Sequence, residues 1–150
     1  MIPGGAVGAK EDGMVKLVAV LMAWLGAHTP YSGDVALPEV RRAEPQRLQE
    51  MMYGDRAHVR ALEVMALYDP DTATVWLSTA FDPKRVQHRG YLLHELVHHL
   101  QYANDAEFLC RPAREPEAYH FQEMWLEQQG AAFQHDWFTI FATSRCKMVY

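Results

Sequence analysis

The stretch GYLLHELVHHLQY, residues 90–102, places three histidines and one glutamate in a run that is otherwise almost wholly apolar. Leu93, Val97 and Leu100 recur at helical spacing, so the run predicts a buried helix from about Val86 to Ala103. Unpaired imidazole and carboxylate groups cost on the order of several kcal/mol to bury. The fold must therefore supply partners for these groups. This requirement restricts the possible folds more than any other feature of the chain.

Within this run, His94, Glu95 and His98 form an HExxH pattern. Residues four apart lie on one face of a helix, so both imidazoles can reach a single Zn²⁺ ion while Glu95 projects toward a water on the open side of the metal. A zinc ion held there would lower the pKa of that water and polarise a carbonyl, and Glu95 would take the proton of the water and pass it to the leaving amine. The pattern predicts zinc-dependent hydrolysis of a peptide or other amide bond. The alternative is that these residues are only polar groups of the core.

A catalytic zinc site uses three protein ligands, so one more must come from elsewhere in the chain. Glu115 and Glu117 lie near the start of the next predicted helix, and packing of the two helices can bring either carboxylate to the histidines. His99 and His120 are weaker candidates. His99 points about 100° away from His98 on the same helix, so we expect it to contact a backbone carbonyl or solvent.

The motif HELVHHLQ followed by EPEAY resembles the gluzincin-type zinc metallopeptidases, especially their minimal bacterial members. The second motif of that family reads Glu-x-x-Ala followed by Asp or another polar residue, and its first glutamate binds the metal. The resemblance implies Glu115, in preference to Glu117, as the third ligand, with Ala118 packed against the metal-binding helix. Tyr119 stands where an aspartate often orients a ligand histidine. Its hydroxyl could orient that histidine more weakly, or stabilise an oxyanion.

The resemblance covers about Leu62 to Gly130 and implies a minimal zincin-like domain. It further implies that the strand Thr74 to Thr79 forms the rim of the cleft, where an extended peptide or protein substrate adds as a further strand. Trp76, Tyr68 and Tyr91 are then candidate cleft residues, although a role in the core is the more general expectation for aromatic side chains. Three other residues at helical spacing are expected to serve in packing and hydrogen-bond networks: Gln101, Gln122 and Trp125.

The remaining pattern predicts helices around a β-hairpin, which is an α+β fold. Two runs of branched and aromatic residues flank the breaker DPDTA and predict the hairpin strands, Leu62 to Tyr68 and Thr74 to Thr79. Pro30, Gly33 and Pro38 predict that HTPYSGDVALPEV is an irregular connection. The other predicted helices are Met14 to Gly26, Pro45 to Tyr53, residues 116–130, and Gln134 to Thr143.

The chain has 150 residues and is expected to form one domain over residues 14–150, after a flexible leader or cloning remnant at 1–13. A formal net charge of −5 without a concentrated basic face argues against nucleic acid as a partner. The sequence contains neither a phosphate-binding glycine loop nor a Gly-x-Ser-x-Gly elbow.

The apolar run Leu17 to Ala27 is too short for a membrane span, which needs about 20 apolar residues. We expect a core helix there in preference to a signal peptide. Cys110 and Cys146 are either two separate thiols or a disulfide. Pairing would slightly favour a periplasmic or secreted protein, and two free thiols a cytoplasmic one.

A non-catalytic function is the main alternative. The same helix pair could hold a structural metal, or a former peptidase could now bind a partner. The fourth position on the metal separates these functions, because an open position favours an enzyme. Closure by His120, Glu117 or a cysteine would favour the structural role.

Overall fold

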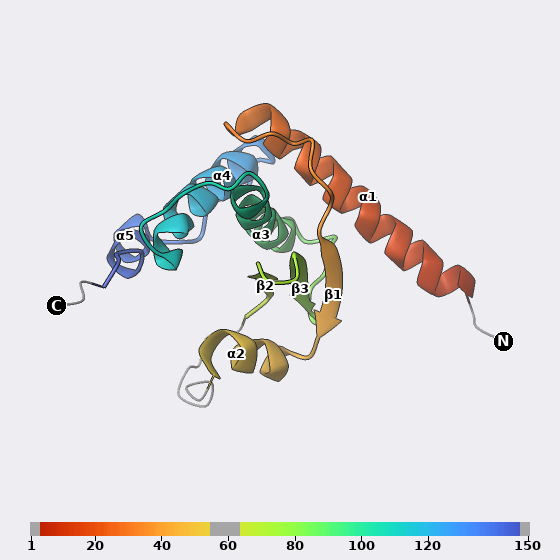
Figure 1. Cartoon of the computed structure of the whole chain (residues 1–150). Helices are drawn as coiled ribbons and strands as arrows, with labels where there is room; N and C mark the ends of the chain where they lie inside the picture. Colours follow the sequence, from red (N-terminus) through yellow and green to blue (C-terminus); the bar gives the residue numbers. More distant parts are fainter. Residues whose placement is uncertain (1–3, 55–63, 148–150) are drawn as a thin grey trace.

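The computed structural model describes residues 4–54 and 64–147, and its α+β architecture confirms the predicted class (Figure 1). The elements in chain order are α1 (Gly4–His28), β1 (Glu39–Ala43), α2 (Pro45–Tyr53), β2 (Ala66–Asp69), β3 (Thr74–Ser78), α3 (Val86–Ala103), the short 3₁₀ helix η2 (Arg111–Arg114), α4 (Glu115–Gln128) and α5 (Trp137–Thr143).

Local chemistry explains several of these boundaries. Pro116 and two acidic residues occupy the first turn of α4, where proline fits the backbone and negative charge complements the helix dipole. Gly130 follows the end of α4 with φ +74°, a conformation that glycine adopts readily. Asp136 caps α5 by accepting hydrogen bonds from the backbone N–H groups of Phe138 and Thr139.

Other boundaries differ from the predictions. Helix α1 begins at Gly4, ten residues before the predicted start at Met14 and inside the segment assigned to a leader. The first hairpin strand runs from Ala66 to Asp69, while Leu62, its predicted first residue, lies outside the described part of the chain. Helix α5 begins at Trp137, because the cap at Asp136 precedes it.

Strand β1 lies partly in the segment that was predicted to be irregular, so that prediction is wrong at Glu39 and Val40. The sequence EVRRA has no apolar alternation, and its residues are exposed or half-buried. Backbone pairing with β3 defines this strand: β1 runs parallel to β3, with Glu39 opposite Thr74 and Ala43 opposite Ser78. Such a pairing between distant segments leaves no local hydrophobic signal.

The three-stranded sheet has the order β1-β3-β2, and β2 runs antiparallel to β3. Strand β3 is therefore the middle strand. The prediction that a peptide pairs along Thr74 to Thr79 is wrong for Thr74–Ser78, because β1 and β2 already occupy both edges of this strand. Among the described strands, β2 keeps one edge unpaired on the side away from β3.

Helix α3 lies between the sheet and α4, and α1 crosses against it (Figure 1). One apolar core joins these elements. Leu93, Leu96 and Leu100 of α3 are completely buried in that core. Ala118 of α4 is also fully buried, in agreement with the small residue expected to pack against α3. A Cβ on Gly90 would lie 3.3 Å from the side chain of Leu126, so α3 and α4 approach each other closely there.

Cys110 and Cys146 form a disulfide, which decides between the two alternatives for the cysteines. The bridge joins the residue before η2 to the segment after α5, and so holds two chain segments together at one end of the molecule.

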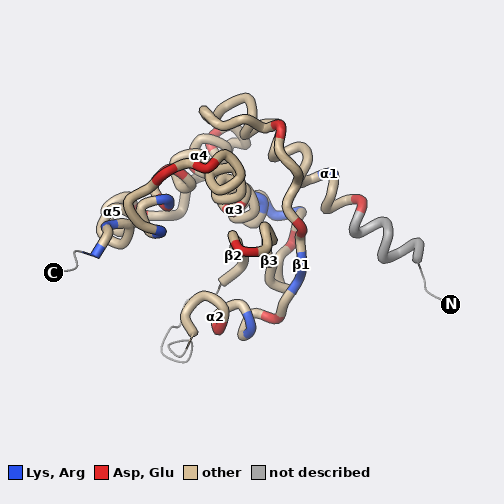
Figure 2. The backbone as a smooth tube through the Cα atoms, viewed as in Figure 1, with Lys and Arg blue, Asp and Glu red and all other residues tan. Residues whose placement is uncertain are grey.

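None of the described helices is long and apolar enough to cross a bilayer. Arginines are distributed among β1, α2, α3 and η2, and Figure 2 shows them interleaved with acidic residues.

We expect the double substitution Cys110→Ala/Cys146→Ala to lower the free energy of unfolding by roughly 3–4 kcal/mol, because the cross-link closes a loop with a sequence separation of 36. Urea denaturation followed by circular dichroism measures the difference. An unchanged midpoint at an unchanged m-value would show that the bridge adds no stability.

Candidate metal and active site

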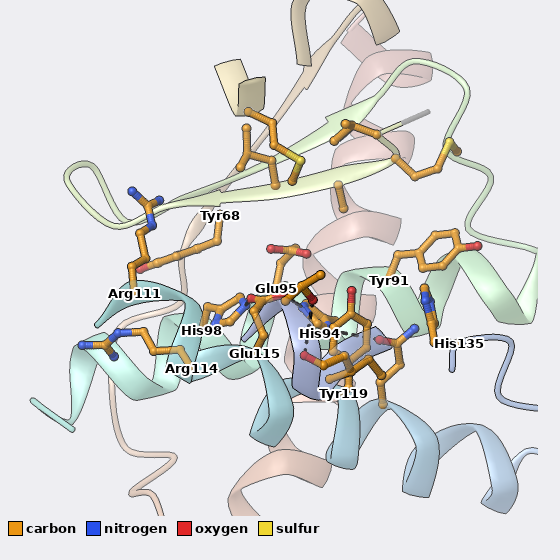
Figure 3. Close-up of a pocket in the computed structure, with 18 of the residues that line it drawn as sticks. Tyr68, Tyr91, His94, Glu95, His98, Arg111, Arg114, Glu115, Tyr119 and His135 are labelled. Carbon is orange, nitrogen blue, oxygen red and sulfur yellow. Dashed lines mark hydrogen bonds and ion pairs between the residues drawn. The ribbon is translucent and has the colours of Figure 1, made fainter. Parts of the chain in front are cut away.

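Helix α3 presents His94, Glu95 and His98 to one pocket of about 970 Å³ (Figure 3). One potential ligand atom from each of these residues lies within 4.8 Å of the others. Both imidazoles are buried, with 6% and 9% of His94 and His98 exposed. The end of α2, strand β2, the junction of η2 with α4, and α5 form other walls of the pocket.

Glu115, the first residue of α4, joins this cluster. Its Oε2 atom lies 3.3 Å from Nε2 of His94, and its Oε1 atom contacts Nε2 of His98. Glu117 is directed elsewhere, because its carboxylate accepts hydrogen bonds from the hydroxyl of Tyr31 and from Gln101 Nε2, the latter at 3.2 Å. Of the two candidate glutamates, the structure brings only Glu115 to the histidines.

Two glutamine side chains orient the two imidazoles. Nδ1 of His94 lies 2.9 Å from Oε1 of Gln122, and Nδ1 of His98 lies 2.9 Å from Oε1 of Gln101. An amide oxygen only accepts hydrogen bonds, so each Nδ1 carries the hydrogen and donates it. The amide nitrogen of Gln101 donates to the carbonyl oxygen of Arg114 at 3.0 Å, which independently fixes the orientation of this amide. Both glutamines are thus network residues, as predicted.

In its neutral form, each histidine would then carry a lone pair on Nε2 that faces the Glu115 carboxylate. Two lone pairs and a carboxylate repel one another unless a cation lies among them. Burial alone would lower the pKa of His94, but the negative charges of Glu115 and Glu95 outweigh it, and the pKa rises to about 9. Burial raises the pKa of Glu115, but the adjacent histidines hold it far below its usual value. The cluster therefore attracts positive charge, as a proton or a metal ion.

Glu95 occupies the same pocket and has a raised pKa. Burial is the largest cause, and the charges of His94 and His98 oppose it only in part. The backbone N–H of Tyr68 on β2 donates a hydrogen bond to the Glu95 carboxylate. The side of β2 that faces Glu95 is therefore its unpaired edge.

Tyr119 packs its ring against His94, with the ring centroids 4.3 Å apart. The expectation that its hydroxyl orients a ligand histidine is corrected here, because Gln122 already accepts the hydrogen bond from Nδ1 of His94. Burial raises the pKa of Tyr119, and the charges of Glu115 and Glu95 raise it further, so the hydroxyl stays protonated.

His135 lines the pocket and was not predicted from the sequence. Its ring lies 4.9 Å from that of Tyr119, and its pKa is lowered by burial and by the charge of His94. It lies between α4 and α5 as a single histidine, without a motif around it. Only the position of this loop against α3 identifies it.

His99 faces away from the cluster. Its Nε2 donates to the carbonyl oxygen of Ala36 at 2.7 Å, and its Nδ1 accepts from the hydroxyl of Tyr68 at 2.9 Å. Burial lowers the pKa of His99, so the ring is neutral and can accept this bond. His99 therefore contacts a backbone carbonyl, as expected, and ties β2 to α3.

The structure brings only two of the three predicted cleft residues to the pocket. Tyr68 and Tyr91 line the pocket, whereas Trp76 does not. Val75 and Leu77 of β3 are buried in the core, and Trp76 between them points to the opposite face of the sheet. The prediction of Trp76 as a cleft residue is therefore wrong.

Among known protein families, residues 10–149 match the family model described as Domain of unknown function (DUF6647). The chain belongs to the DUF6647 family. No curated protein and no solved structure matches the chain significantly. The description of DUF6647 carries no activity, so the chemistry of the site has to be inferred from its residues.

We expect Gln122→Leu to weaken Zn²⁺ binding by roughly 10–100-fold, because His94 loses the acceptor that orients its ring. Titration with a fluorescent zinc chelator as competitor measures the affinity. Gln129→Leu makes the same change at an exposed residue after α4 and should leave the affinity unaltered. Equal affinities for both variants and the wild type would show that Gln122 does not support a metal ligand.

Proposed function

We propose that this protein is a zinc-dependent hydrolase of peptide or other amide bonds. His94, His98 and Glu115 bind one Zn²⁺ ion, and Glu95 is the general base. One observation carries the proposal: the Nε2 atoms of two buried histidines, whose Nδ1 atoms are held by amide oxygens, converge on one carboxylate. This arrangement of acceptors favours positive charge at its centre, which a zinc ion would supply.

The set of donor atoms fits zinc. Two imidazole nitrogens and one carboxylate are a usual ligand set of catalytic zinc, whereas Ca²⁺ and Mg²⁺ bind mainly to oxygen. The glutamines that orient both imidazoles supply the outer hydrogen bonds that zinc-binding histidines normally make.

When bound, zinc supplies a Lewis acid that polarises a carbonyl and makes a water more acidic. Glu95 takes the proton of this water and transfers it to the leaving amine. Its raised pKa makes Glu95 a better proton acceptor, and a general base works best when its pKa lies near the working pH. The protonated hydroxyl of Tyr119 is a candidate donor to the charge that develops on the carbonyl oxygen.

The substrate is an extended peptide or protein segment. The unpaired edge of β2 borders the pocket beside Glu95, so a substrate can add there as a further strand. The proposed substrate position is therefore along β2 instead of along β3.

The positions of the other potential ligands favour an enzyme over a structural metal site. Glu117 is bonded to Tyr31 and Gln101, and Cys110 and Cys146 are joined to each other. His120 is exposed and does not line the pocket. These four residues therefore leave the fourth position on the metal to water and substrate.

The disulfide supports an oxidising compartment, such as a periplasm or the exterior of a cell, because disulfides persist there.

We expect Glu95→Gln to lower peptide hydrolysis by roughly 10²–10⁴-fold without loss of zinc, because the amide cannot take the proton from water. Cleavage of a peptide library followed by mass spectrometry, together with elemental analysis, measures both quantities. Glu127→Gln is the matched control at an exposed position of α4 and should behave as the wild type.

We expect His98→Ala to lose both the metal and the activity, because one of three ligands is removed. His120→Ala, at an exposed position of α4, serves as its control. Wild-type protein that is folded but free of zinc after purification without chelator would contradict the proposal, and so would full activity of Glu95→Gln.

A further inference from the structure

Two arginines lie at one end of the pocket, beyond His98. Figure 3 shows Arg111 and Arg114 on this side, with Tyr68 nearby and His135 at the opposite end. We propose that Arg111, assisted by the charge of Arg114, binds a carboxylate group of the substrate. The inference rests on the proposed function, because it names the class of peptide that the same pocket accepts.

The turn that carries both arginines is held in place by the site itself. Gln101 accepts a hydrogen bond from His98 through one amide atom and donates to the carbonyl oxygen of Arg114 through the other. Cys110, immediately before Arg111, is held by its disulfide with Cys146. The position of Arg111 relative to His98 is therefore set by the same network that orients the histidine.

Neither guanidinium group forms an ion pair with a described residue. No carboxylate oxygen of the described residues lies within 4.0 Å of either group. Arg114 stacks over the rings of Tyr102 and Phe108, at 3.9 Å and 4.7 Å from the ring centroids. Its Nη2 atom donates to the carbonyl oxygen of Ala106 at 3.3 Å, while its buried Nη1 atom has no hydrogen-bond partner among the described residues. Among the described residues, the direct partners of the Arg114 guanidinium are thus two aromatic rings and one neutral acceptor.

Arg111 is the group that can reach a ligand. Its side chain is exposed and makes no hydrogen bond or ion pair within the described residues. A free guanidinium presents two parallel N–H donors, which match the two oxygens of a carboxylate. A second positive charge beside it strengthens the attraction for an anion.

The distribution of charge in the pocket also favours one end of the pocket for the carboxylate of the peptide. Glu95 and Glu115 occupy the centre, and Asp136 lines the pocket at the α5 side. An anionic group is repelled from these carboxylates and attracted to the arginine end. The carboxylate of a peptide is either an Asp or Glu side chain or the C-terminus, and both offer the same chemistry to Arg111.

Binding of peptides to the zinc-loaded Glu95→Gln protein tests the inference without hydrolysis. Four random hexapeptide libraries are compared by affinity selection and mass spectrometry. The first pair lacks Asp and Glu and has either a free or an amidated C-terminus. The second pair is amidated and contains either one Glu or one Gln. We expect at least one carboxylate library to bind about tenfold more tightly than its neutral counterpart, and the responding pair identifies the source of the carboxylate.

The substitution Arg111→Gln, added to the Glu95→Gln protein, should remove this preference. Arg111→Lys should retain only part of it, because a lysine keeps the charge but not the paired donors. Arg85→Gln is the matched control, since Arg85 is exposed and does not line the pocket. Because Arg111 is exposed, its replacement should leave the fold intact, which circular dichroism checks.

Equal binding of all four libraries, or a carboxylate preference that persists in Arg111→Gln, would overturn the inference. Hydrolysis by the wild type is scored separately. Cleavage without carboxylate preference supports the proposed function and removes this inference. Carboxylate-dependent binding that requires Arg111, without any cleavage by the wild type, supports this inference and removes the proposed function.

Discussion

The burial of helix α3 governs how the other elements are arranged. The sheet, α1 and α4 surround this helix, and His94, His98, His99 and Gln101 are among its buried residues. Each buried polar atom without a partner costs about 1–3 kcal/mol, so the neighbouring elements must carry matching groups. Helix α4, strand β2 and the segment before β1 supply them, and their positions around α3 create the site.

Two adjacent histidines of α3 have different partners because their side chains point in different directions around the helix axis. His98 and His99 are about 100° apart around the helix axis. The ring of His98 faces Glu115 and belongs to the cluster that attracts positive charge, while the ring of His99 joins Tyr68 to the carbonyl oxygen of Ala36. The second set of bonds holds β2 in place. The hydrogen bond from the backbone of Tyr68 to the proposed base, Glu95, depends on that position.

Gln101 connects the proposed metal site to the proposed substrate site. One end of its amide orients His98, and the other end bonds to Glu117 and to the backbone of Arg114. A buried amide with all its partners satisfied is rigid. The backbone of the turn that carries the proposed carboxylate-binding arginine is therefore held relative to His98.

The α+β class, the extent of α3 and the shared face of His94 and His98 could all be predicted from the sequence, because a helical period of 3.6 residues is a local property. The strand order could not be predicted, since β1 has no hydrophobic alternation to signal its pairing with β3.

The spacing in the sequence did not distinguish Glu115 from Glu117 as the third ligand. Only the resemblance to gluzincins favoured Glu115. Packing of α4 on α3 brings Glu115 to the histidines and leaves Glu117 with other partners. Arg111 reaches the pocket from a segment that carries no motif. The direction of a side chain on a helix follows from neighbours in the chain, whereas convergence of side chains from α3, η2 and α4 follows from long-range packing.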